Sequence, residues 1–465
     1  LGPCTQHLSE IKTVEEQMQR KLFVLSMDAM VDKDLEYLEK KPNYSLLLGR
    51  GARVNRMMSI YPSITYPAHV SLITGCRTAT HGVFNNTKFG FSAPYPDWHL
   101  YSEMIQVEDL FAAAKRAKMS TAAVYWPVTG RNPNIDYLLN EYFFYEPGER
   151  VSMEQVCACF ATQGANQETE QIVRENFNRF PSEELSADTK LTLAQTFDHF
   201  INGCVCSLIR RHQPDLLVAH NCYLDTLRHR HGVFHPYLDE GLDMTDLWLG
   251  EIIEAMREAG VFEQTDFILL SDHGQMNIAR RIKLNHILAQ RGMIEVAPDG
   301  SVRSWRAYAQ SNGMSASIFV KDPKDESEVH KLLASLVDEG VWGVGALYTR
   351  EEVAKTYGWS GSFSFVLETD GITAFSEGVS EPTSSFVDLT SYGTTKASHG
   401  YKPEKGPHPV FVATGPAFAE GARVEQASII DVAPTLAHTF GQRMPQAEGR
   451  ILTELLRQTS KPHRS

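Results

Sequence analysis

The sequence lacks two features by which proteins associate with large partners. One is a long apolar segment that could span a membrane, and the other is an excess of basic residues that could bind nucleic acid. Its 465 residues contain no run of about eighteen apolar residues, so we expect no membrane-spanning helix. It also lacks an excess of basic residues, because 44 Lys and Arg stand against 57 Asp and Glu, giving a net charge of −13. Nucleic-acid polymers need clustered Lys and Arg, so no such partner is expected. A small phosphate-containing ligand is compatible with this charge, because bound metal ions supply positive charge locally.

The sequence is equally poor in disulfide and export signals. It has seven cysteines, an odd number, and the pairs Cys157/Cys159 and Cys204/Cys206 are too close for ordinary bridges within each pair. The spacing of a zinc ribbon, with two Cys-x-x-Cys pairs, is missing. Residues 1–21 lack the basic-then-apolar layout of a signal peptide. These features predict a reduced, cytoplasmic protein, although a chain that begins with Leu can be missing upstream sequence.

Short apolar runs alternate with amphipathic segments along most of the chain. Buried strands are expected at 21–28, 121–125, 215–220 and 267–270, with helices between them. This alternation predicts an α/β fold, a three-layer α/β/α sandwich with a central, mostly parallel sheet.

Two segments depart from this pattern. Residues about 146–213 are polar and helical and predict a helical insertion, whereas 282–386 predict a small α/β cap subdomain. The catalytic core is therefore expected to comprise 1–281, including the insertion, and 387–465.

Carboxylates and imidazoles follow the ends of several expected strands. Because ligands gather beyond the carboxyl ends of parallel strands, these side chains are expected to meet at one edge of the sheet. Oxygen and nitrogen donors of this kind suit zinc or another divalent ion. The spacing Asp225-x-x-x-His229 places both side chains on one face of a helix. Two half-sites can be assembled, and they are Asp225, His229 and His399 for one and Asp28, Asp272 and His273 for the other.

The second half-site would be completed by a hydroxyl, and Thr65 is the candidate. It lies between two prolines at the start of a helix, where free N–H groups favour an anion. A metal-bound hydroxyl becomes a nucleophile; the alternative is a helix-capping residue. Asn86 offers an amide that could bind substrate and stabilise charge on a transferring phosphoryl group, or serve as a loop hydrogen-bonding residue. Tyr66 and Trp126 could form the wall of a substrate pocket, although core packing is the more common role for Trp126.

Three further residues near these positions are open to two readings. Arg228 either faces the pocket or is a solvated helix residue. His231 is interpreted as a surface residue, because the spacing assigns His229 as the ligand. His220 either supports the ligands or is a core histidine with its hydrogen bonds satisfied.

The ordered motifs resemble the alkaline-phosphatase superfamily, and more closely its nucleotide pyrophosphatase/phosphodiesterase branch. They span residues about 22–418, and they are Ser26-Met-Asp28, Thr65-Tyr-Pro-Ala-His-Val-Ser-Leu-Ile-Thr-Gly75, His81-Gly82 with Asn86, Tyr125-Trp-Pro127, Asp225-x-x-x-His229-x-x-Gly232, Ser271-Asp-His-Gly274 and His399-Gly-Tyr401. The resemblance implies hydrolysis of phosphodiester or nucleotide pyrophosphate bonds, with two zinc ions, a threonine nucleophile and a phosphothreonine intermediate. The chain departs from animal members in lacking cysteine-rich N-terminal modules and dense disulfides.

Other reactions are compatible with the same ligand set. A phosphonate hydrolase of the phosphonoacetate type and a phosphomonoesterase would use the same site, and a non-catalytic ligand-binding relic is a third alternative. The sulfatase branch is disfavoured, because no Cys/Ser-x-Pro-x-Arg sequence is present. The sequence leaves the physiological substrate and the oligomeric state open.

Overall fold

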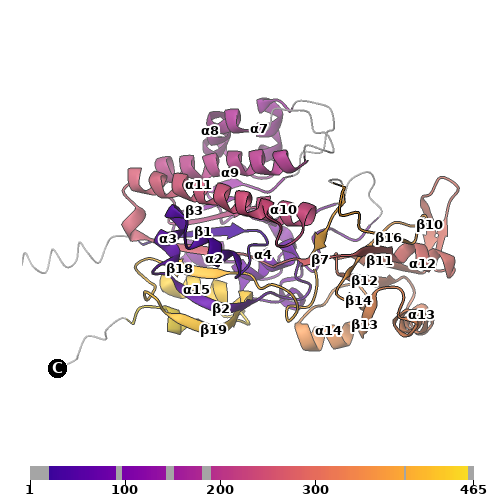
Figure 1. Cartoon of the computed structure of the whole chain (residues 1–465). Coiled ribbons are helices and arrows are strands. Elements are labelled where there is room, and N and C mark those ends of the chain that lie inside the picture. The colour runs from indigo at the N-terminus through magenta and orange to yellow at the C-terminus, as the bar shows by residue number, and fades with distance from the viewer. Residues whose placement is uncertain (1–19, 91–96, 143–150, 181–189, 392–393, 459–465) are drawn as a thin grey trace, which may run out of the picture.

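The computed structural model describes residues 20–90, 97–142, 151–180, 190–391 and 394–458 (Figure 1). Its centre is an eight-stranded sheet in which every strand runs in one direction except β18, which is antiparallel to both of its neighbours. This confirms the expected mostly parallel sheet. The strand order is β19 (Arg423–Ser428), β2 (Ala52–Met58), β18 (Phe411–Thr414), β6 (Thr265–Leu270), β1 (Lys21–Met27), β5 (Leu216–Asn221), β3 (Thr121–Val124) and β4 (Tyr137–Leu139).

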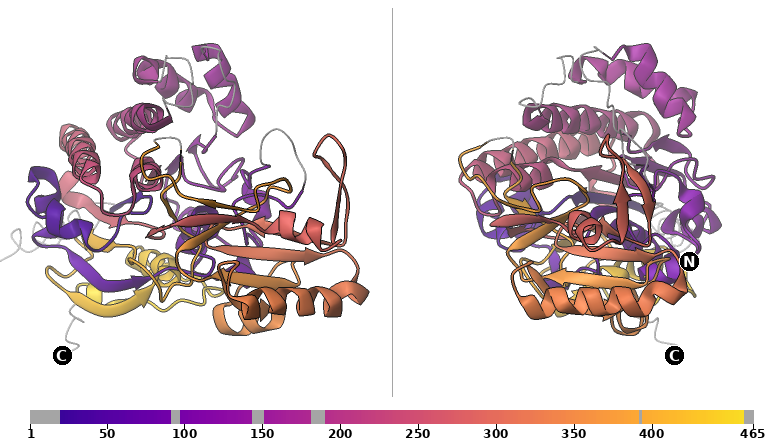
Figure 2. Two further views of the ribbon diagram at one scale, coloured as in Figure 1. Left: turned by 45° about the vertical axis from the view of Figure 1, so that its right-hand side comes forward. Right: turned by 90° about the vertical axis from the view of Figure 1, so that its right-hand side faces the viewer.

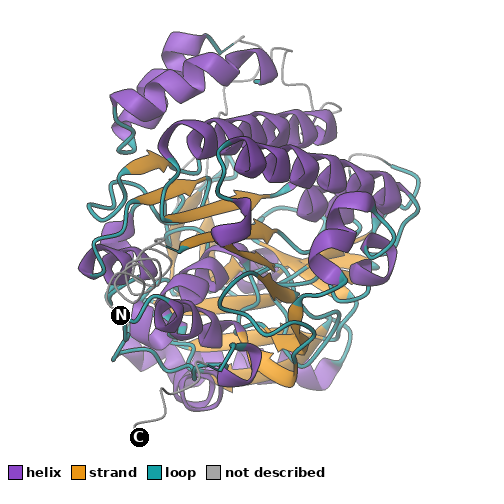
Figure 3. Cartoon of the chain, turned by 90° about the vertical axis from the view of Figure 1, so that its left-hand side faces the viewer, coloured by secondary structure: helices purple, strands orange, loops and turns teal. Residues whose placement is uncertain are grey.

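Helices cover both faces of this sheet (Figure 3). Successive side chains of a strand point to opposite faces, so Phe23 and Leu25 of β1 enter one hydrophobic core while Leu22 and Val24 enter the other. The first core lies under α3 (Pro42–Leu48), α9 (Lys190–His212) and α11 (Tyr237–Glu258). The second lies under α4 (Thr65–Thr74), α6 (Leu110–Arg116) and α15 (Val432–Thr439). The predicted three-layer sandwich is therefore confirmed.

The predicted insertion is helical where it is described. It contains α7 (Met153–Thr162) and α8 (Gln167–Asn176), which lie above α9 in Figure 1. The long helix α9 packs side by side with α11 and so joins the insertion to the helical layer over the sheet. Short helices α2 (Asp34–Leu38), α5 (Thr78–His81) and α10 (Tyr223–His231) lie in the connections of the core.

The segment that was expected to form a cap has its own sheets (Figure 2), and its buried side chains form a separate hydrophobic core. A four-stranded sheet has the order β11 (Ala307–Ser311), β12 (Ser315–Val320), β14 (Phe365–Thr369) and β13 (Val344–Thr349), with α13 (Glu326–Glu339) and α14 (Arg350–Tyr357) beside it. A three-stranded sheet of β15 (Thr373–Ser376), β8 (Arg280–Lys283) and β16 (Ser384–Phe386) adjoins it. The helix α12 (Leu284–Gln290) follows β8 in the chain. The hairpin of β9 (Ile294–Val296) and β10 (Val302–Trp305) turns at Asp299-Gly300. The short pair β7 (Met276–Asn277) and β17 (Ala397–Ser398) lies between core and cap. The exact boundaries 282–386 stay a prediction.

None of the described helices combines the length and apolar character that crossing a membrane requires. The six cysteines within the described ranges are all free thiols.

Candidate active site

Chain direction brings the predicted ligands together. Strands β6, β1 and β5 are adjacent and parallel, so their carboxyl ends lie at one edge of the sheet. Asp28 follows β1 directly, Asp272 follows β6, and α10 begins just after β5. Parallel strand β2 leads to Thr65, the first residue of α4, at the same edge. Topology therefore places the acids, the imidazoles and the hydroxyl in one region.

The first cluster is fully buried. Asp28, Asp272 and His273 each offer one donor atom, and these atoms all lie within 4.8 Å of one another. His273 Nε2 lies 3.2 Å from Asp272 Oδ2 and 3.5 Å from Asp28 Oδ1. The same nitrogen lies 3.2 Å from Thr65 Oγ1. The structure thus brings the predicted half-site and its predicted hydroxyl together.

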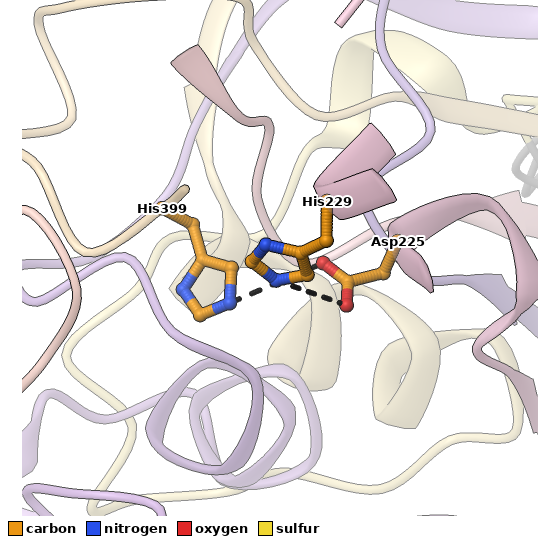
Figure 4. A group of neighbouring side chains, drawn as sticks. All are labelled: Asp225, His229 and His399. Carbon is orange, nitrogen blue, oxygen red and sulfur yellow. Dashed lines mark ion pairs between the residues drawn. The ribbon is translucent and has the colours of Figure 1, made fainter. Parts of the chain in front are cut away.

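The second cluster is half-buried and contains Asp225, His229 and His399 (Figure 4). His229 Nε2 lies 3.4 Å from Asp225 Oδ2, one helical turn away, and His399 Nε2 lies 4.0 Å from Asp225 Oδ1. His229 Nδ1 lies 2.7 Å from the carbonyl oxygen of Ala397. A proton donated there leaves the Nε2 lone pair free to bind a metal ion. Sequence reasoning missed Gln275, whose amide donates a hydrogen bond to Asp225 Oδ1.

The two clusters adjoin each other. The rings of His273 and His399, one from each cluster, have centroids 4.3 Å apart. Gly274 follows His273 where the chain passes another segment, and a Cβ at this position would lie 2.4 Å from the carbonyl oxygen of Pro407. A glycine is therefore required for the close approach of the two segments.

Electrostatics indicate that the clusters need positive charge. Burial, and then the neighbouring Asp272 and Asp225, raise the pKa of Asp28 well above its ordinary value. Within the described ranges, Asp28 Oδ1 and Asp272 Oδ2 are buried without a hydrogen-bond partner. Burial, followed by His273 and His229, lowers the pKa of His399, which keeps this imidazole neutral. Uncompensated carboxylates beside a neutral imidazole are what divalent ions bind, so these residues fit metal sites.

Histidines behind the clusters support them. His220 is buried, and its Nε2 lies 3.3 Å from Oδ2 of the predicted ligand Asp28 while its Nδ1 lies 3.2 Å from the carbonyl oxygen of Tyr125, so both of its readings fit the structure. His69 contacts Ser26 Oγ at 2.9 Å and the carbonyl oxygen of Thr65 at 2.8 Å. Burial lowers the pKa of His69 to about 3, so this ring is neutral and links the end of β1 to the start of α4.

A cleft of about 520 Å³ extends from His399 between the core and the cap. Its walls include residues 85–90 and Trp98 on the core side and Tyr308 and residues 310–313 on the cap side. Asn86 lines the cleft, and its Oδ1 accepts a hydrogen bond from the backbone N–H of Tyr66 at 2.9 Å. This bond fixes the side chain of Asn86 beside the start of α4 and leaves its NH2 group for a ligand.

The chain matches a known protein family over most of its length. The family model described as type I phosphodiesterase / nucleotide pyrophosphatase matches residues 22–402. The chain belongs to this family. An uncharacterized pyrophosphatase/phosphodiesterase of Schizosaccharomyces pombe is 24% identical over 268 residues, covering 55% of this chain and 45% of the relative. Human ectonucleotide pyrophosphatase/phosphodiesterase family member 5 is 22% identical over 434 residues, covering 90% of this chain and 74% of the relative.

Solved structures agree with the fold. Murine ectonucleotide pyrophosphatase/phosphodiesterase 5 superimposes with a TM-score of 0.65 at 19% identity, covering 94% of this chain and 100% of that one. An inactive threonine-to-alanine variant of the murine protein has been solved in complex with AMP. The chain spans 45% and 31% of the length of the fission-yeast relative and a Caenorhabditis elegans relative, respectively.

Two residues that were predicted to contact substrate are instead buried. Tyr66 is 1% exposed and its ring packs against Trp98 with centroids 5.1 Å apart. Trp126 is 1% exposed and lies in the core against His69. The structure therefore does not support a pocket-wall role for either residue. Trp98, which sequence reasoning missed, lines the cleft in place of Tyr66.

Both readings of Arg228 were wrong, as was the reading of His231 as a surface residue. Arg228 is fully buried, and its guanidinium binds the carboxylate of Asp34 and the carbonyl oxygens of Ala29 and Val233. It fastens α10, which carries Asp225 and His229 of the second cluster, to the segment after β1. His231 is 8% exposed. The spacing of Arg228 and His231 along the helix does not show which groups from other segments surround them, so their burial could not be predicted from it.

Proposed function

We propose that this chain hydrolyses phosphodiester or nucleotide pyrophosphate bonds at a two-metal site, with Thr65 as the nucleophile. The observation that carries the proposal is the position of Thr65 Oγ1, 3.2 Å from His273 Nε2 in the first ligand cluster and at the N-terminus of α4. The AMP complex of the murine relative supports a nucleotide phosphate as the kind of ligand bound. Family membership supports the reaction class.

The residues present fit two zinc ions. Asp28, Asp272 and His273, with the hydroxyl of Thr65, would hold one ion, and the second would be held by the cluster of Asp225, His229 and His399. Three imidazoles and three carboxylates form a nitrogen and oxygen donor set suited to zinc. Bound ions of this kind lower the pKa of a hydroxyl or water and neutralise phosphate charge.

The reaction then proceeds by two nucleophilic displacements at phosphorus. Deprotonated Thr65 Oγ1 attacks phosphorus in line, and the bond from phosphorus to the leaving oxygen breaks to give a phosphothreonine. Water then attacks the same phosphorus, the bond to Thr65 Oγ1 breaks, and a proton from that water restores the threonine hydroxyl as the phosphate product leaves. The NH2 group of Asn86 and the N–H of Thr65 at the helix N-terminus would bind the non-bridging oxygens.

Replacement of Thr65 tests this assignment. Thr65→Ala should lower turnover of bis-p-nitrophenyl phosphate by zinc-loaded protein by at least about 10³-fold, because removing a nucleophile removes the covalent route. Metal content and thermal stability should stay unchanged. Thr74→Ala, on the same helix but bonded to the carbonyl oxygen of Val70, serves as the matched control and should retain turnover.

A second readout makes the test independent of rate. Acid-quenched wild-type protein should carry a phosphoryl adduct on the peptide that contains Thr65. Turnover in Thr65→Ala equal to wild type, or an adduct on another residue, would refute the nucleophile assignment. Comparing p-nitrophenyl phosphate and phosphonoacetate with the diester separates diesterase activity from the monoesterase and phosphonate alternatives. The cytoplasmic location stays a prediction.

A further inference from the structure

The loops that carry Thr65 and His399 are bound to each other and to the cap. The N–H of Gly400 donates to the carbonyl oxygen of Ser63 at 2.9 Å, which joins the two loops directly. The N–H of Met314, in the cap, donates to the carbonyl oxygen of His399 at 2.8 Å. The relative position of nucleophile and ligand therefore depends partly on groups outside the core sheet.

Tyr61, shortly before the proposed nucleophile, inserts its ring into the cap. It is 1% exposed and belongs to a hydrophobic cluster whose other buried members are all cap residues. Its ring meets Trp359 and Tyr357 edge-on, with centroids 4.7 Å and 5.0 Å apart. The loop that leads into α4 is thus anchored in the cap by an aromatic side chain.

A single buried carboxylate of the cap bonds to both loops. Glu368, on β14, is 1% exposed. Its Oε2 accepts a hydrogen bond from Tyr61 Oη at 2.6 Å, on the Thr65 side. Its Oε1 accepts from Lys405 Nζ at 3.0 Å and from the N–H of Lys402 at 3.3 Å, on the His399 side. The charged partner and the buried setting make these bonds strong ones.

We propose that Glu368 is a positioning residue that sets the distance between Thr65 and His399, and so aligns nucleophile and second metal site for the reaction proposed above. The inference rests on that proposed function. Glu368 does not touch the reacting atoms; it acts through Tyr61 and Lys402, which flank them in sequence. A displacement of about 1 Å between reacting groups lowers a rate by about 10²-fold. Loss of this carboxylate should therefore reduce kcat without weakening substrate binding.

The variant Glu368→Gln tests the proposal, because glutamine keeps the size but offers one acceptor oxygen in place of two. We expect kcat for bis-p-nitrophenyl phosphate to fall by about 10- to 100-fold, with KM changed less than about threefold and metal content unchanged. Amide hydrogen exchange should become faster in residues 61–66 and 399–402. Tyr61→Phe, which removes one of the bonds, should have a smaller effect that is not additive with Glu368→Gln.

Asp325→Asn provides the matched control. Asp325 is also a cap carboxylate, 8% exposed, but its bonds at 2.8 Å and 3.2 Å go to Arg306 within the cap. This variant should lose stability while kcat and exchange in both loops stay at wild-type values. The proposal is overturned by wild-type kcat or exchange in Glu368→Gln, or by the same changes in Asp325→Asn. If the wild-type chain hydrolyses no diester, the proposed function fails, and the exchange measurement still decides whether Glu368 holds the two loops.

Discussion

Glu141 provides a sharp test of the electrostatics behind the site. Its side chain is 3% exposed. Burial raises its pKa from 4.5 to about 8, a hydrogen bond with Tyr66 opposes this shift, and Asp198 and Asp272 add to it. Between these pH values the folded state holds a proton that the unfolded state has released. The stability associated with protonated Glu141 is therefore fully present below about pH 4.5 and is lost progressively as the pH rises to about 8.

The size of this effect follows from the two pKa values. Raising a carboxyl pKa from 4.5 to about 8 corresponds to roughly 5 kcal/mol of stability lost once the group is charged in the folded protein. Glu141→Gln keeps the side-chain length and a partner for Tyr66 but carries no charge. Relative to wild type, the free energy of unfolding of this variant should therefore increase by roughly 4 kcal/mol between about pH 5 and pH 9, because part of the loss has already occurred at pH 5.

Urea unfolding of chelator-treated protein across this pH range measures the difference. Glu103→Gln, a change at an exposed glutamate, should give a curve parallel to wild type and serves as the control. In zinc-loaded protein the effect should shrink, because bound cations offset the charge of the neighbouring Asp272. If the stabilities of Glu141→Gln and wild type run parallel over the whole range, the buried carboxyl does not titrate as the structure requires and the reasoning is wrong.

Two further predictions concern the second half-site and the helix that carries it. His399→Ala should lower the bound metal from about two ions per chain towards one, measured by elemental analysis, because the second cluster then keeps too few donors. His330→Ala in the cap should leave the metal content unchanged. Unchanged stoichiometry in His399→Ala would contradict the pairing of ligands. Arg228→Ala should lower the free energy of unfolding by about 3–5 kcal/mol, because Asp34 is left as a buried unpaired charge. Arg230→Ala on the same helix should cost less than about 0.5 kcal/mol in the same assay, and equal losses would argue against the buried pair.

The sequence predicted those parts of the fold and site that follow from local pattern and chain direction. The apolar run Phe267–Leu270 lies within β6. The carboxylate after it, Asp272, lies at the carboxyl edge of the parallel strands, next to Asp28. The spacing of Asp225 and His229 requires only one turn of helix, and α10 supplies it. Burial of alternate residues and the common direction of the strands are enough to determine these positions.

Side chains whose surroundings come from distant segments could not be placed in this way. The role of Arg228 depends on Asp34, which is almost two hundred residues away, and its sequence neighbours carry no sign of that pairing. Tyr66 follows the proposed nucleophile directly, yet Trp98 covers its ring. Periodicity predicts whether a residue faces the core, but not which distant group will lie against it.

The cap shows why this distinction matters for function. Every proposed metal ligand belongs to the core, so a search of strand ends finds the reacting groups but no reason for the cap to affect the reaction. Glu368 supplies a reason, because it bonds to Tyr61 and to the Lys402 backbone on the two loops that must be aligned. In the sequence, Glu368 is only one residue of a segment that forms the buried strand β14, and nothing in that segment indicates its contacts. A sequence pattern therefore does not predict residues that act on catalysis through other residues. Such residues are identified from the contacts between subdomains.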